Sequence, residues 1–169
     1  LVNIVRNNAS KLAEQYNKDL IIIDGPPGTG CSAVAAITGT DMVLVVSEPT
    51  VSGLHDLKRV LELTSHFMIP TVVCINKYNI NEKTALMIEN FCTEAEIPVL
   101  GGLPYNDIAT KAMLHEKTVI EYAKNSELAN EREFANEIRE IWAKIENRLM
   151  DESDEINNQD IRSEFSNQE

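Results

Sequence analysis

The stretch that decides the fold is Leu20-Ile-Ile-Ile-Asp24-Gly-Pro-Pro-Gly-Thr-Gly-Cys31-Ser32. Four apolar residues run into an acid, and a loop rich in glycine and proline follows at once. Buried strands of parallel sheets carry continuous apolar runs of this kind, and ligands bind beyond the carboxyl ends of such strands. The stretch therefore predicts a buried strand that delivers a carboxylate and a phosphate-sensing loop to a nucleotide.

The loop has two functional interpretations. Residues 25–32 almost match the phosphate-binding loop G-x-x-x-x-G-K-[ST], which would suit a P-loop kinase or an AAA-type ATPase, but Cys31 stands at the lysine position. A thiol cannot replace the ammonium group that reaches the β- and γ-phosphates. In the second interpretation Asp24 is the acid beside a magnesium ion, and Gly28 approaches the γ-phosphate through its backbone N–H. A tight turn between a strand and a helix, with no ligand, is the structural alternative.

Composition limits the class of protein. The 169 residues are 43% hydrophobic and 25% charged, which is ordinary for one globular domain. The net charge of −12 argues against nucleic acid and anionic membranes as direct partners. The apolar runs are too short to cross a bilayer and no secretory signal opens the chain, so we expect a cytoplasmic protein. Residues 151–169 hold seven acids and one arginine, and we expect them to form a disordered acidic tail behind a domain of residues 1–150.

Neither the cysteines nor the histidines show the spacing of a metal site. Cys31, Cys74 and Cys92 lack a C-x-x-C pair, so we expect reduced thiols in the core or in loops. The histidines fall within helical patterns and have no partners at ligand spacing, so we expect surface or hydrogen-bonded core positions for His55, His66 and His115.

Strands and helices alternate along the chain, which favours an α/β fold with a doubly wound, mostly parallel sheet flanked by helices. Short apolar runs predict strands at Leu20–Ile23, Met42–Val46, Thr71–Ile75 and Pro98–Leu103. Helical patterns cover Val2–Tyr16, Val51–His66, Glu82–Ala95, Asp107–His115 and Glu127–Met150, with Asn81 and Asn106 as candidate caps. The last helix carries one apolar stripe, which we expect to pack on the sheet or on a neighbouring helix.

Polar residues follow each predicted strand. They are Asp24, the segment Ser47-Glu-Pro-Thr50, the segment Asn76-Lys-Tyr78, and the segment Leu103-Pro-Tyr-Asn106. Because the carboxyl ends of parallel strands meet at one edge, these four groups are predicted to line one site.

Four motifs of this sequence resemble those of a known family. D-G-P-P-G-T-G at Asp24–Gly30, S-E-P-T-x-S-G-x-x-D at Ser47–Asp56, I-N-K at Ile75–Lys77 and L-P-Y at Leu103–Tyr105 resemble the second half of the MinD/Mrp-type P-loop ATPases of the deviant Walker class. The likeness continues through Lys111-Ala-Met and Val119-Ile-Glu-Tyr122, covers about residues 1–124, and is greatest to members with an inserted ferredoxin domain.

The resemblance implies ATP and Mg²⁺ as cofactors and a role for individual residues. Asp24 would hold magnesium through water, and Gly28 would sense the γ-phosphate. Asn76 would bind the adenine edge with Lys77 beside it, although Asn76 also suits a simple turn after a strand. The remaining implied contacts to the nucleotide come from Gly25, Pro27, Thr29, Glu48, Leu103 and Pro104. The family usually has an acid at the position of Asn106, so no charged role is carried over there.

The 169 residues contain neither the lysine-bearing phosphate loop nor the cysteine clusters of the ferredoxin insert. The resemblance places Leu1 where the chain would re-enter the ATPase domain after that insert, so we expect a fragment or a trimmed chain. It implies a missing N-terminal half, a second copy in an ATP-bound dimer, and an iron–sulfur or redox partner, with any cluster confined to the missing insert. Without the lysine loop, this chain is expected not to hydrolyse ATP alone. The alternative is a protein-binding adaptor on the same fold, inactive in catalysis.

Overall fold

In a computed structural model, the backbone is described for residues 2–166 and the side chains for residues 2–150. The helices are α1 (Val2–Gln15), α2 (Cys31–Ile37), α3 (Val51–His66), α4 (Glu82–Glu94), α5 (Ile108–Leu114), α6 (Val119–Lys124) and α7 (Ala129–Ser166). The strands are β1 (Val43–Ser47), β2 (Thr71–Asn76) and β3 (Val99–Leu103), and the 3-10 turn η1 (Tyr78–Ile80) follows β2.

The sheet is parallel throughout and has the order β1-β2-β3. Val43 pairs with Thr71 at the start of β1, and Ser47 pairs with Ile75 at its end. A register shift between Val73 and Cys74 precedes the pairing of β2 with the end of β3. All three strands therefore end at one edge, as the alternation of strands and helices predicted.

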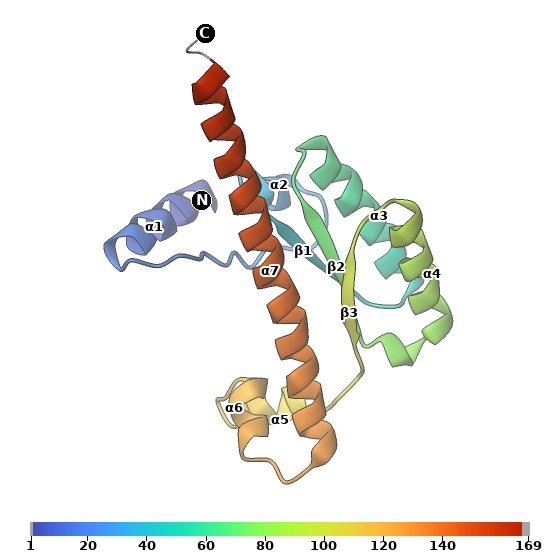
Figure 1. Ribbon diagram of the computed structural model, residues 1–169. Helices are drawn as coiled ribbons and strands as arrows, with labels where there is room; N and C mark the ends of the chain where they lie inside the picture. Colours follow the sequence, from blue (N-terminus) through green and yellow to red (C-terminus); the bar gives the residue numbers. More distant parts are fainter. Residues whose placement is uncertain (1, 167–169) are drawn as a thin grey trace.

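Helices cover both faces of the sheet (Figure 1), which confirms the doubly wound α/β class. On one face, α3 and α4 pack Leu57, Leu61 and Ile88 against Val73 and Ile75 of β2. On the other face α7 crosses the strands and packs apolar side chains on the alternate residues of β2 and on β3; this cluster contains Val72, Cys74, Leu100 and Ile141. The central strand is consequently buried from Thr71 to Ile75.

The apolar stripe of α7 packs as predicted, and it also holds a smaller helical unit. Phe134 and Ala135 of α7 lie against Ile108 of α5 and Ala123 of α6 in a second cluster. This unit lies at the carboxyl edge of β3, because Leu103 contacts both clusters. The long helix thus fixes α5 and α6 relative to the sheet (Figure 1).

The prediction of a buried strand at Leu20–Ile23 is wrong. These residues belong to no helix or strand, and Leu20, Ile21 and Ile22 are 45%, 41% and 75% exposed. A strand forms by pairing its backbone with a neighbour, and within residues 2–166 this segment pairs with no strand. β1 is also less buried than its apolar run predicted, since Leu44 and Val46 remain exposed.

Two helices were not predicted. α2 is short and follows the glycine-rich loop, and Arg6 of α1 donates hydrogen bonds to the carbonyl oxygens of Ala35, Thr38 and Gly39 at its end. α6 begins with a capping box in which Thr118 and Glu121 bond each other reciprocally. α7 runs to Ser166, beyond the predicted helix end at Met150. The predicted disorder of the acidic tail, residues 151–169, stays a prediction.

Candidate functional site

Three of the four predicted polar groups meet at the carboxyl edge of the sheet. Ser47 ends β1, Asn76 ends β2 and Leu103 ends β3, and Asn76 pairs with Leu103 in the parallel register. Neighbouring strands lie about 4.8 Å apart, so these residues and those that follow them form one continuous surface. Open parallel sheets bind ligands at such an edge.

An ion pair joins the first two strand ends directly. Lys77 Nζ lies 2.6 Å from Glu48 Oε1, and both side chains are partly exposed. A pair in contact with water contributes little to stability. Its effect is geometric, because it brings the segment after β1 and the segment after β2 together, as the predicted site required.

A tight turn fixes the position of Glu48. Thr50 caps α3 by accepting a hydrogen bond of 2.8 Å from the backbone N–H of Gly53. The buried Ser47 hydroxyl donates to the Gly53 carbonyl oxygen at 3.3 Å. A methyl group added at Gly53 would lie 2.2 Å from the Glu48 carbonyl oxygen, so only glycine fits here. The backbone at Glu48 therefore has little freedom.

The glycine-rich loop lies apart from this network. Asp24 is exposed, and no hydrogen bond or ion pair among the described side chains joins it to Glu48, Asn76 or Lys77. Gly28 has a φ of +83°, a conformation that favours glycine. The structure therefore brings Glu48, Asn76, Lys77, Leu103 and Pro104 together, and it leaves residues 24–29 on a separate segment.

One contact that the sequence did not predict anchors this segment. The guanidinium of Arg59 on α3 donates a hydrogen bond of 2.9 Å to Thr29 Oγ1. The two residues are separated by 30 positions along the chain, and nothing in the local pattern around Arg59 distinguishes it from a surface arginine. Such a contact depends on how α3 packs and could not be predicted from spacing.

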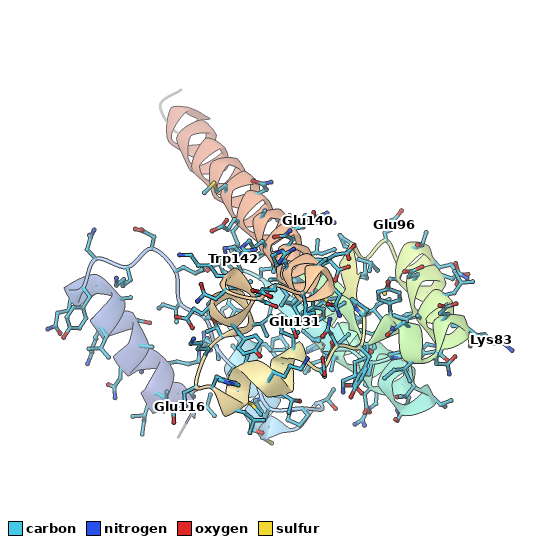
Figure 2. The ribbon with its side chains drawn as sticks, turned by 90° about the horizontal axis from the view of Figure 1, so that it is seen from below. Lys83, Glu96, Glu116, Glu131, Glu140 and Trp142 are labelled. Carbon is cyan, nitrogen blue, oxygen red and sulfur yellow. The ribbon has the colours of Figure 1, made fainter. Side chains whose placement is uncertain are left out.

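A buried carboxylate holds the helical unit next to β3. Glu131 of α7 is only 2% exposed; it accepts a bond of 2.9 Å from Lys111 Nζ and one of 2.5 Å from the Ser126 hydroxyl. The hydrogen bond from Ser126 and then that from Lys111 lower the pKa of Glu131, so the group stays ionised. Figure 2 shows Glu131 among the helices, whereas Lys83, Glu96 and Glu116 lie at the periphery. The contact between Lys111 and Glu131 holds α5 to α7, next to the segment that follows β3.

The thiols and the acids give no metal centre in the described part of the chain. No group of three or more histidine, cysteine, aspartate or glutamate side chains among the described residues is arranged to hold a metal ion. Cys74 and Cys92 are buried, and burial raises the pKa of both thiols. Cys31, at the first residue of α2, is exposed.

Comparison with known families identifies the chain. Residues 59–161, more than half of the sequence, match the family described as 4Fe-4S iron–sulfur cluster binding proteins of the NifH/frxC type. The chain belongs to the NifH/frxC family. The match begins within α3 and takes in β2 and β3 with the segments that follow them.

Relatives of this NifH/frxC chain include an ATP-binding protein and a septum site-determining protein. An uncharacterized ATP-binding protein of Methanocaldococcus jannaschii is 30% identical over 94 residues, which are 56% of this chain and 36% of the relative. The septum site-determining protein MinD of Bacillus subtilis is 25% identical over 126 residues, 72% of this chain and 46% of that protein. The chain thus spans less than half the length of these curated relatives.

The fold is shared with a solved MinD. The MinD cell division protein of Aquifex aeolicus superposes with a TM-score of 0.66 at 18% identity, covering 86% of this chain and 59% of that chain. Together these comparisons support a MinD/NifH-like P-loop ATPase family for the NifH/frxC chain. No helix in the described residues is both long enough and apolar enough to span a membrane.

Proposed function

We propose that this chain supplies the base side and the magnesium side of an ATP site in a MinD/NifH-like ATPase, and that hydrolysis needs a lysine-bearing phosphate loop from the rest of the protein. The observation that carries the proposal is the edge where the three strands end. There Asn76 lies beside Leu103, and Lys77 pairs with Glu48 at 2.6 Å. A side-chain amide offers both a donor and an acceptor to a base edge.

Each predicted residue keeps its role in this proposal. Asn76 binds the adenine edge, flanked by Lys77 and Glu48, while Leu103 and Pro104 contact the base through their backbone. Asp24 is the Walker B acid and Gly28 the glycine of switch II. Their loop neighbours Gly25, Pro27 and Thr29 line the phosphates.

Magnesium fits the donor chemistry of the loop. Mg²⁺ in nucleotide sites keeps several waters and takes one or two carboxylates together with phosphate oxygens. The exposed carboxylate of Asp24 meets that need, and bound Mg²⁺ would neutralise charge on the phosphates. The chain's own contribution is to hold this acid at one end of a loop that Arg59 fixes at the other, through Thr29.

Two exposed apolar surfaces support the proposal that a further part of the ATPase domain packs on this chain. β1 is an edge strand whose Leu44 and Val46 side chains are 39% and 57% exposed. The strand-like residues Leu20, Ile21 and Ile22 lie exposed and unpaired within the described chain. Strand edges and apolar faces of this kind are normally covered. We assign this cover to the missing N-terminal half with the phosphate loop, in a protein that binds ATP as a homodimer in the cytoplasm.

The iron–sulfur chemistry in the family's description does not fit the thiols of this chain alone. A 4Fe-4S cluster is generally held by four cysteine thiolates. The chain has three cysteines; Cys74 and Cys92 are buried core thiols, which leaves Cys31 as the exposed thiol of each copy, two rather than four in the proposed homodimer. We therefore place any cluster or redox partner outside these residues, in an inserted ferredoxin domain or a partner protein.

A second candidate, an adaptor without hydrolysis, rests on α7. Glu133 and Glu140 are exposed and, seven residues apart, lie on nearly the same face of this helix, where they would offer two carboxylates to a basic protein partner. This candidate predicts binding of a basic partner that does not depend on ATP.

Two substitutions test the proposal in a protein that also carries the lysine loop. Asp24→Asn should weaken the magnesium dependence of ATP binding by about tenfold or more, because it removes the ionised metal acid. Cys31→Lys should leave ATP affinity unchanged, because that position does not contact the phosphates. Tight ATP binding created by Cys31→Lys, with normal magnesium dependence in Asp24→Asn, would show that residues 25–32 are themselves the phosphate loop.

A further inference from the structure

The 3-10 turn η1 touches the ends of all three strands. On the β1 side, Lys77, which caps the turn, pairs with Glu48. On the β3 side, the Tyr78 ring lies so close to Gly102 that an added Cβ there would be 2.9 Å from Tyr78 Cδ1. The turn itself follows Asn76 after a single residue. It is therefore built into the edge of the candidate site.

A further contact of the turn involves the backbone of the segment that follows β3. Asn79 Oδ1 accepts a hydrogen bond of 2.6 Å from the backbone N–H of Tyr105. Tyr105 directly follows Leu103 and Pro104, the residues assigned to the base. The side chain of Asn79 thereby ties η1 to the segment that leaves β3, across 26 positions of sequence.

The backbone of the turn is specified by its surroundings. Lys77 has a φ of +55°, which is uncommon for a residue other than glycine. The Ile80 N–H donates to the Lys77 carbonyl oxygen at 3.0 Å and closes the turn. Conformations of this kind persist only where neighbouring contacts determine them, and they cluster at binding sites.

The contact from Asn79 also changes which hydrogen-bonding groups the segment can offer to a ligand. Proline has no N–H, and the Tyr105 N–H is engaged by Asn79. Residues 104 and 105 are left with carbonyl oxygens, which accept hydrogen bonds only. At position 6 adenine carries an amino group, which can donate to such an acceptor, whereas guanine carries a carbonyl oxygen there, which cannot.

We propose that Asn79 is a specificity-determining residue for the base. It acts by occupying the Tyr105 N–H, so that the Pro104–Tyr105 segment selects adenine over guanine. Lys77 and Tyr78 are the positioning residues that hold the turn of Asn79 in place. The choice of base rests on the proposed function. The hydrogen bond itself does not, and it can be measured without any nucleotide.

The first measurement is amide hydrogen exchange of Tyr105 in the purified 169-residue chain without ligand. Asn79 is exposed, so its substitution leaves the core intact. Asn79→Leu removes the acceptor and should speed exchange of the Tyr105 amide by about tenfold, the size expected for one hydrogen bond. Asn79→Asp keeps an acceptor oxygen and should stay within about twofold of the wild type. Unchanged exchange in Asn79→Leu would overturn the proposal.

The second measurement is titration of the same chain with adenosine and with guanosine, followed by NMR shifts of the Asn76 side chain and the Leu103 amide. The wild type and Asn79→Asp should prefer adenosine, and Asn79→Leu should lose about tenfold of that preference. An unaltered preference would overturn the specificity role. If exchange responds as expected but neither nucleoside shifts Asn76 or Leu103, the turn contact stands and the proposed base site is wrong.

Discussion

Gly53 offers the sharpest test of how the edge of the sheet is built. It lies in the first turn of α3, where replacing glycine by alanine ordinarily stabilises a helix by about 1 kcal/mol. Here the added methyl group would lie 2.2 Å from the Glu48 carbonyl oxygen and 3.0 Å from Thr50 Oγ1. The nearest atom belongs to the backbone, so the turn that carries Glu48 must move.

Overpacking of this kind costs about 1–3 kcal/mol, and a clash with backbone belongs at the upper end of that range. After the gain in helix propensity is subtracted, Gly53→Ala should lower the free energy of unfolding by about 2 kcal/mol. With a urea m-value of about 2 kcal/mol/M, the denaturation midpoint should fall by about 1 M.

The matched control is Gly30→Ala. Gly30 caps α2 with a φ of −73° that alanine can adopt, and an added Cβ there meets nothing within 4 Å. This variant should leave the midpoint unchanged or raise it slightly. Equilibrium unfolding in urea, followed by circular dichroism, measures both. A Gly53→Ala protein as stable as the wild type would show that the turn between Ser47 and Gly53 is not packed as described.

Three further outcomes follow from single contacts. Asn81 caps α4 by accepting a bond of 3.1 Å from the Thr84 N–H, so Asn81→Ala should cost about 1 kcal/mol in urea unfolding while Asn81→Ser costs far less. Folding lowers the pKa of Glu131 from about 4.5, so ionised Glu131 stabilises the folded state above that pH, and this stabilisation is lost as the pH falls through the folded-state pKa. Glu131→Gln should therefore lower the urea midpoint at pH 7 and make the loss of stability at acidic pH less steep. Burial, together with the charges of Glu133 and Glu140, raises the pKa of Glu137 above about 4.5. Protein stability should therefore fall as the pH rises from about 4.5 through the folded-state pKa of Glu137. Glu137→Gln should raise the urea midpoint at pH 7 and leave it unchanged near pH 4.

The paired strands and most helices were predictable because their signals are local. The strand runs that became β1, β2 and β3 were located within one residue, and α3 was located without error at Val51–His66. The Asn81 cap was confirmed by its bond to Thr84. At the other candidate cap, Asn106 accepts a bond from the Ile108 N–H, while Asp107 occupies the capping position itself.

Leu20–Ile23 shows where local patterns stop being sufficient. Its apolar run is that of a buried strand, but burial depends on a neighbour that the sequence of the run does not contain. The contacts of Arg59 with Thr29 and of Asn79 with Tyr105 were missed for a related reason. Each joins residues more than 25 positions apart through side chains that are individually ordinary. Periodicity carries no information on such pairs.

The measurement that tests the central claim most directly is magnesium-dependent ATP turnover by the purified 169-residue chain, compared with the same chain joined to a segment that supplies a lysine-bearing phosphate loop. Our account predicts no turnover above background for the chain alone, because nothing in it offsets the charge that develops on the transferred phosphate. It predicts turnover that Asp24→Asn abolishes in the joined protein. Clear magnesium-dependent hydrolysis by the 169 residues alone would contradict it.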